Sequence, residues 1–189
     1  IRNSGRTNKI TLPLVDVLAN GGDRILDAGC GAGRTTIAIA KAMPKAKITA
    51  FDRFDADYIN EGGMNLLKRN IELARIENRV FIETGDILKT PFDNNQLDAI
   101  VSSFMIDHLR KGKQQALSEI YRILKPDGRF LLIIFVRGYT TFGIASFMSL
   151  FMTSEKIWRI WIGQAGFKMI SDGKINEGHY FYFEKQSIK

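Results

Sequence analysis

The sequence predicts an α/β protein with a doubly wound, mostly parallel sheet of seven strands, in which the last strand is antiparallel. Short apolar runs alternate along the chain with segments whose apolar residues recur at helical spacing, which is typical of strands joined by crossover helices. The candidate functional residues follow directly after the apolar runs, where a sheet of this kind binds its ligands. The 189 residues, 45% of them hydrophobic, are enough for one domain over residues 1–189 with a sizeable core.

The first strand and the turn after it carry the main functional signal. Arg24–Ala28 is a short apolar run, and Gly29, Gly31 and Gly33 follow it two residues apart. Glycine allows a sharp turn and lets a ligand approach the backbone. A helix over about 34–43 comes next, and its unpaired N–H groups and positive dipole end favour the polar end of a nucleotide-like molecule. The G-x-G-x-G spacing differs from the G-x-G-x-x-G of dinucleotide sites.

Two acidic residues strengthen the glycine signal. Asp27 lies two residues before the first glycine. Asp52 ends the second apolar run, Lys47–Phe51. An acidic side chain at the end of this strand can accept both hydroxyls of a ribose. The sequence therefore predicts a nucleoside-binding site at the carboxyl ends of the first two strands.

The middle of the chain continues the alternation of strands and helices. A helix is expected after Gly63, because the apolar residues that follow share one helical face. The most apolar run of the chain, Phe130–Val136, is typical of a strand that is covered on both faces. The remaining elements expected here are strands at 79–83 and 97–101, a helix at 113–125 and a turn at 125–128, and a further helix is expected near 14–18.

The C-terminal part of the chain predicts a helix and two strands. Ser154 caps a helix that carries Trp158 and Trp161 and ends at Gly166. Strands at 167–170 and 179–183 are joined by a short connection, which requires antiparallel pairing. The segment 139–152 is apolar but too short to span a bilayer. We expect it to form a lid over the substrate, and ordinary core or a lipid-contacting surface stay open as alternatives.

Composition excludes several classes of site. Cys30 is the single cysteine, so an intrachain disulfide and a cysteine-based metal site are excluded, and a reducing, cytoplasmic compartment is expected. No His/Asp/Glu spacing typical of metal ligands is present, so no metal is predicted. The net charge of +7 is scattered along the chain, which argues for a solvated surface and against a nucleic-acid groove. The first residue is Ile rather than Met, which leaves open a preceding segment and a membrane association through it.

With these motifs placed, the chain resembles the class I S-adenosylmethionine-dependent methyltransferases, which have a Rossmann-like fold. It is most similar to their branch of quinone-biosynthesis and arsenite methyltransferases. The resemblance covers roughly residues 10–136. It departs from the family at Asp127, where a second glycine is usual, and at 53–57 together with the glycine pair at 62–63. The motifs that carry it, in the family's order, are Ile25–Gly33, Asp52, Gly85–Phe92, Leu97–Ser103 and Leu124–Phe130.

The resemblance implies S-adenosylmethionine as the cofactor and a position for each of its parts. Gly29 and Gly31 are expected against the methionine portion, which Ser103 would also face. Asp52 would hold the ribose and Asp86 the adenine amino group, with the backbone of the next residue against the ring. The predicted cofactor-binding residues are Asp27, Gly29, Cys30, Gly31, Gly33, Asp52, Arg53, Gly85, Asp86, Ile87 and Ser103.

The reaction implied by the resemblance needs little from the protein beyond placement. The enzyme aligns the nucleophile with the methyl group and excludes water, and a general base is required only if the nucleophile is protonated. His108 is a weak candidate for that base, and a packing or capping role is favoured for it; His179 is expected to be structural. The leading function is methyl transfer to a small, apolar or lipid-like molecule, with peripheral membrane contact. A nucleic-acid methyltransferase and a non-catalytic cofactor-binding protein are the alternatives, and neither the acceptor nor the oligomeric state follows from the sequence.

Overall fold

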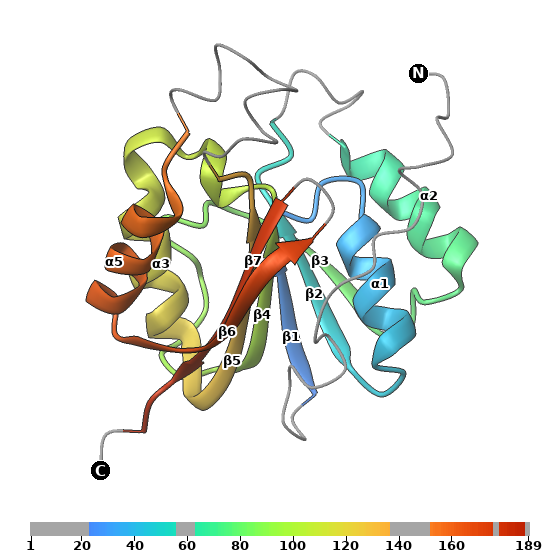
Figure 1. The fold of residues 1–189 in the computed structure, drawn as a ribbon. Helices are drawn as coiled ribbons and strands as arrows, with labels where there is room; N and C mark the ends of the chain where they lie inside the picture. The colour runs from blue at the N-terminus through green and yellow to red at the C-terminus, as the bar shows by residue number, and fades with distance from the viewer. Residues whose placement is uncertain (1–22, 56–62, 137–151, 176–177, 188–189) are drawn as a thin grey trace.

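The computed structural model describes residues 23–55, 63–136, 152–175 and 178–187, which form one seven-stranded sheet with helices on both faces (Figure 1). The strand order is β3-β2-β1-β4-β5-β7-β6. The strands are β1 Arg24–Ala28, β2 Lys47–Asp52, β3 Val80–Thr84, β4 Leu97–Ser103, β5 Leu124–Ile134, β6 Phe167–Ile175 and β7 Gly178–Lys185. The helices are α1 Arg34–Ala42, α2 Met64–Ala74, η3 Ile106–His108, η4 Arg110–Gly112, α3 Lys113–Ile123 and α5 Glu155–Gln164.

This topology confirms the predicted fold class. Strands β1 to β5 are parallel, and β7 pairs antiparallel with both β5 and β6. The chain builds outward from β1 through β2 to β3, and then returns to the other side of β1 with β4 and β5. The order of the strands therefore reverses between β1 and β4. Ligands of doubly wound sheets bind at the carboxyl ends of the strands beside such a reversal.

The sheet separates two apolar cores, one under α3 and α5 and the other under α1 and α2 (Figure 1). Strand β5 shows the reason, because its side chains alternate between the two faces. Phe130 and Leu132 belong to the first core, whereas Leu131 and Ile133 belong to the second. All four are buried. The prediction that this run is covered on both faces is confirmed.

Strand β5 begins earlier than the sequence predicted. Leu124 already pairs with Leu97, and the pairing resumes at Arg129 opposite Ala99 after a shift of register. The residues between them were predicted as a free turn and instead form an irregularity within the strand. Pro126 cannot donate to a ladder, and Asp127 has a left-handed φ of 60°. This conformation favours glycine, which explains why the resembled family usually has a glycine there.

Helix α5 is buried on one side only. Trp158 and Ile162 enter the first core, while Ile157 and Ile160 are exposed. None of the helices in the described ranges has the length and apolar character needed to cross a membrane. The helix expected near 14–18 and all but the last residue of the lid expected over 139–152 lie outside the described residues.

Candidate functional site

The glycine turn lies at the carboxyl end of β1, at the start of α1 (Figure 1). Gly29, Gly31 and Gly33 have φ values of 81°, 48° and 83°, which are left-handed. A Cβ atom on Gly29 would lie 2.4 Å from the side chain of Met105, and one on Gly33 would lie 2.4 Å from Leu67. A Cβ on Gly31 would meet no described atom within 4 Å. Packing therefore requires the outer two glycines, while the middle one leaves its backbone open to a ligand.

The start of α1 is suited to an anion or a polar group. Gly33 is the N-cap residue, no side chain caps the helix, and its first turn contains no acidic residue. Asp27, which bonds to Thr36 in this turn, and Asp52, which bonds to Gly31 just before it, compensate part of the positive charge of the helix end. A ligand oxygen could bind there.

Asp52 joins the ends of three neighbouring strands. Its Oδ2 accepts the N–H of Gly31 at 2.8 Å, and its Oδ1 accepts the N–H of Phe54 at 3.0 Å. Its own carbonyl accepts the N–H of Gly85, which follows β3, at 3.0 Å. A carboxylate has about four lone-pair sites in all, so Asp52 retains capacity for two further donors. The carboxylate is thus fixed beside the open backbone of Gly31.

Asp27 is completely buried beside this turn. Its Oδ2 accepts the hydroxyl of Thr36 at 2.6 Å, whereas its Oδ1 has no hydrogen-bond partner among the described residues. The pKa of Asp27 is raised to about 7, mainly by burial and also by the nearby charge of Asp52, while hydrogen bonding to Thr36 acts in the opposite direction. A buried carboxylate with one unpaired oxygen suits a cationic donor such as an ammonium group.

Asp86 extends the row of acidic residues to the end of β3. Its Oδ1 accepts the N–H of Leu88 at 2.9 Å, and its Oδ2 lies 4.0 Å from the Arg53 guanidinium. Arg53 also pairs with Asp55 at 2.5 Å. The structure thus brings Asp52, Arg53 and Asp86 to one edge of the sheet. The adjacent Ile87 has a buried side chain.

Two of the other predicted cofactor residues, Gly85 and Cys30, have packing roles in the structure. A Cβ on Gly85 would lie 2.6 Å from the Phe51 ring, so packing alone requires this glycine. Cys30 is buried, and this burial raises the pKa of its thiol, which makes it an inert filler of the turn. Ser103 ends β4 and is half-buried. The preceding Ser102 donates to the carbonyl of Ala28 at 2.9 Å and holds β4 against β1.

His108 lies on η3, close along the chain to Met105, which touches the glycine turn. Its side chain is 70% exposed, and its Nε2 lies 3.9 Å from Oδ2 of Asp107. Because the ring is exposed and no acceptor is present, the role of His108 as a general base stays a prediction. The contact of Met105 with Gly29 and the hydrogen bond between Thr36 and Asp27 were not predicted from the sequence. Each joins two segments whose relative position in space the strand pattern does not give.

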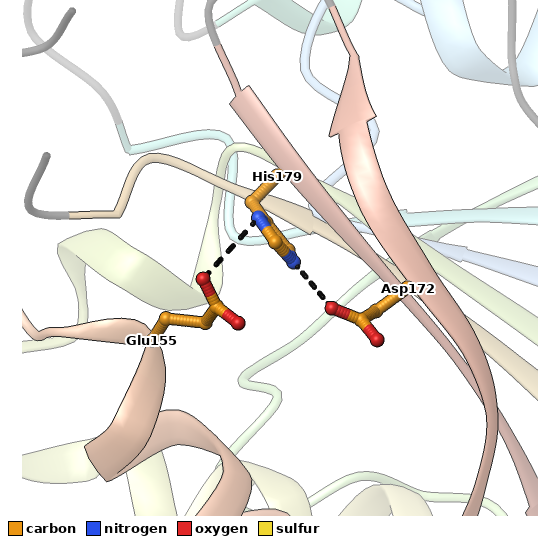
Figure 2. Close-up of side chains that lie close together, drawn as sticks. All are labelled: Glu155, Asp172 and His179. Carbon is orange, nitrogen blue, oxygen red and sulfur yellow. Dashed lines mark hydrogen bonds and ion pairs between the residues drawn. The ribbon is translucent and has the colours of Figure 1, made fainter.

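A cluster of metal-capable side chains lies on β6, β7 and the start of α5, where the sequence spacing predicted no metal site (Figure 2). The Nε2 atom of His179 lies 2.9 Å from Oδ2 of Asp172, and its Nδ1 lies 3.9 Å from Oε2 of Glu155. The two ring nitrogens thus face different carboxylates (Figure 2). The Arg159 guanidinium pairs with both carboxylates and supplies the positive charge between them. His179 also packs on the Phe181 ring. Because Glu155 and Arg159 belong to α5 while Asp172 and His179 belong to β6 and β7, this ion-pair network holds α5 on the sheet.

Most of the residues described above lie in a region that matches a known protein family. A family model described as a methyltransferase domain matches residues 25–128. The match includes the glycine turn, Asp52, Asp86 and Ser103. It ends at Gly128, inside β5.

Curated relatives match the same part of the chain. Demethylmenaquinone methyltransferase of Symbiobacterium thermophilum is 29% identical over 122 residues, which are 64% of this chain and 46% of that enzyme. 24-Methylenesterol C-methyltransferase 3 of Arabidopsis thaliana is 36% identical over 110 residues, 58% of this chain and 28% of that enzyme. The chain thus spans about half the length, or less, of these curated relatives.

Solved structures share the fold over most of the chain. The S-adenosylmethionine-dependent methyltransferase SibL in its apo form superposes with a TM-score of 0.70 at 18% identity. The superposition covers 93% of this chain and 54% of SibL. The likeness therefore extends beyond the family match and includes the antiparallel C-terminal strands.

Proposed function

This chain belongs to the methyltransferase-domain family, and from this premise we propose that it binds S-adenosylmethionine and transfers the methyl group directly to a small, lipid-like molecule. SibL, which shares the fold, is S-adenosylmethionine-dependent. The two curated relatives are named for a demethylmenaquinone and for a sterol. These names support an apolar acceptor that carries a reactive carbon or oxygen.

The observation that carries the proposal is the position of Asp52 beside the open backbone of Gly31. Its carboxylate is fixed by two N–H groups and keeps lone pairs for the two hydroxyls of a ribose. Asp86, just after the end of the neighbouring strand, would accept the adenine amino group. Ser103, at the end of β4, would face the ammonium of the methionine portion, and the buried carboxylate of Asp27 would support it from beneath the turn. These assignments cover the ribose, the adenine amino group and the methionine ammonium.

The bound cofactor supplies a methyl group activated on a sulfonium, and the chain supplies placement. Met105 packs on Gly29 and fixes the start of the segment that follows β4. His108 follows on this segment and would act as base only towards a protonated nucleophile. A lipid-like acceptor is met at a membrane surface, so we also propose peripheral membrane contact of a cytoplasmic enzyme, which co-sedimentation with anionic vesicles tests.

Calorimetry tests cofactor binding. We expect S-adenosylmethionine and S-adenosylhomocysteine to bind and NAD to give no heat, because the glycine spacing and the row of acidic residues suit a single nucleoside. Binding of NAD without binding of S-adenosylmethionine would refute the proposal.

Methyl transfer needs a separate test. The protein is incubated with cofactor labelled in the methyl group and with fractionated cell extract, including a lipid fraction and a nucleic-acid fraction. We expect the label in the lipid fraction. Label in nucleic acid would favour the second candidate, a nucleic-acid methyltransferase, and cofactor binding without any transfer would favour a non-catalytic protein.

A further inference from the structure

Glu155, Asp172 and His179 meet at one end of the sheet, and we refer to these three residues as the histidine cluster (Figure 2). His179 pairs with Ile134, the last residue of β5, so the cluster lies at the carboxyl edge of the parallel strands. Each residue contributes one nitrogen or oxygen atom, and these three atoms lie within 4.8 Å of one another. Imidazole nitrogens and carboxylate oxygens are the ligands of zinc and of similar divalent metals.

Asp172 holds the ring of His179 in a fixed orientation. The side chain of His179 is 7% exposed, and its Nε2 lies 2.9 Å from Oδ2 of Asp172, which is a hydrogen-bonding distance. Since a carboxylate only accepts, Nε2 carries the hydrogen of this bond, and Nδ1 of the neutral ring has a lone pair. Histidines that bind a metal usually donate their other ring N–H to a carboxylate in this way, because it fixes the ring and raises its basicity.

The Nδ1 atom of His179 faces a second carboxylate. It lies 3.9 Å from Oε2 of Glu155, which is too far for a hydrogen bond and places a negative charge opposite the lone pair. A cation between the two atoms removes this repulsion. Zinc binds nitrogen and oxygen ligands at about 2.0–2.2 Å, so two such bonds span up to about 4.2 Å. The gap between Nδ1 and Oε2 therefore has the width that one metal ion bridges.

Arg159 is the cation that already pairs with both carboxylates. Its guanidinium donates to Oε1 of Glu155 at 2.7 Å and also pairs with Asp172, so it uses the oxygen of Glu155 that does not face the ring. Two carboxylates and one guanidinium together carry one negative charge, which still attracts a divalent cation. The Glu155 side chain is 42% exposed, so a hydrated ion reaches its carboxylate from solvent.

We propose that the histidine cluster binds one divalent transition-metal ion, of the zinc type, between Nδ1 of His179 and Oε2 of Glu155. Asp172 is the positioning residue that orients the ring through Nε2, and water completes the coordination. Calcium and magnesium are disfavoured, because they require oxygen ligands and the ring nitrogen takes one position. The ion joins the start of α5 to β7, in addition to the ion pairs of Arg159. This inference does not depend on the proposed function.

Nitrogen NMR of the histidine rings tests the site directly. The chain has two histidines, so a His108→Gln variant assigns the ring signals. Zinc chloride is added to the chelator-treated protein at neutral pH, without S-adenosylmethionine. We expect the Nδ1 signal of His179 to shift as the metal binds there, while Nε2 keeps the hydrogen that it donates to Asp172.

Calorimetry with zinc chloride then measures what each residue contributes. His179→Gln and Glu155→Gln each remove a ligand and should weaken zinc binding by about tenfold or more, and Asp172→Asn should weaken it about tenfold by loosening the ring. His108→Gln is the matched control. His108 also lies 3.9 Å from a carboxylate, that of Asp107, but its ring is 70% exposed, so its loss should leave the affinity unchanged. Calcium chloride should give no comparable heat.

Three results would overturn the inference: no zinc-dependent shift of Nδ1 in His179, equal binding of zinc and calcium, or unchanged zinc affinity in His179→Gln. A ring that keeps a hydrogen on both nitrogens in the presence of zinc would also do so, because a proton then occupies the place of the metal. If a variant fails to fold, the titrations of the wild type still decide. Binding of S-adenosylmethionine is measured separately, so failure of the proposed function and failure of the metal site are distinguishable.

Discussion

Replacing Asp27 by Asn should remove a large pH dependence from the stability of this protein. Asp27 is completely buried, and one of its oxygens is unpaired within the described chain. Asparagine has the same shape, can still accept the Thr36 hydroxyl with its amide oxygen, and carries no charge at any pH. The substitution thus removes the titration and leaves the packing nearly unchanged.

The magnitude follows from the pKa of Asp27. Burial raises it from 3.8 in the unfolded chain to about 7 in the folded protein. Between these pH values the folded state holds a proton that the unfolded state has released, so the stabilising contribution is complete below pH 3.8 and is lost as pH rises through 7. Each pH unit of this interval costs about 1.4 kcal/mol, so the wild type should lose about 4 kcal/mol through this group.

Chemical unfolding at a series of pH values measures this loss. The difference in unfolding free energy between Asp27→Asn and the wild type cancels the titration of all other groups. We expect this difference to increase in favour of the variant from acid to mildly alkaline pH. Asp23→Asn removes an exposed carboxylate just before β1 and is the matched control for the loss of one carboxyl group. Parallel curves for the wild type and Asp27→Asn would show that Asp27 does not titrate in this range, and the reasoning would be wrong.

Three further substitutions test the site and the fold. Asp52→Ala should weaken binding of S-adenosylhomocysteine by about 2–4 kcal/mol in calorimetry, because it removes charge-assisted bonds to the ribose, and an unchanged dissociation constant would remove it from the site. Gly31→Ala should lower the free energy of unfolding by about 1–2 kcal/mol through its left-handed φ, and it should weaken cofactor binding more than Asp127→Ala, where φ is also left-handed but the site is remote. Glu119 has its pKa lowered from 4.5 to about 2 by hydrogen bonding to Arg122, so its contribution is present above pH 4.5 and lost as pH falls through 2. Glu119→Gln should therefore cost about 2–3 kcal/mol in unfolding free energy at neutral pH and little in strong acid, and an equal cost at both would contradict this assignment.

The sequence predicted the fold and the place of the site because both depend on local patterns. Asp27 and Asp52 lie at or near the ends of two apolar runs, so the pattern alone assigned them to the same edge of the sheet, and the family resemblance added Asp86. The short link between 170 and 179 predicted antiparallel pairing, and β6 and β7 pair in this way. Periodicity also predicted that Leu67 and Ile71 face the core, and both are buried.

The sequence could not predict contacts that depend on how distant segments approach. The pairing of Leu124 with Leu97 turned a predicted loop into the start of β5. His179, Asp172 and Glu155 come from three elements, and their spacing along the chain gave no signal of a cluster. The burial of Asp107 depends on how η3 lies against the end of β5, where Asp107 accepts the N–H of Phe135, so a solvated and a buried carboxylate look alike in the sequence.

The hydrogen bonds of the glycine turn determine the order in which this region can fold. The N–H groups of Gly29 and Cys30 donate to the carbonyl of Phe51 at 2.8 and 3.2 Å, and Gly31 donates to the Asp52 side chain. The first three residues of the turn are therefore held by β2, which is separated from them in the sequence by the whole of α1. Bringing such distant segments together costs chain entropy before any bond is gained. The turn can take its final shape only after β1 and β2 have paired, so a substitution that weakens this pairing should also disturb the turn, even when it lies far from the turn in the sequence.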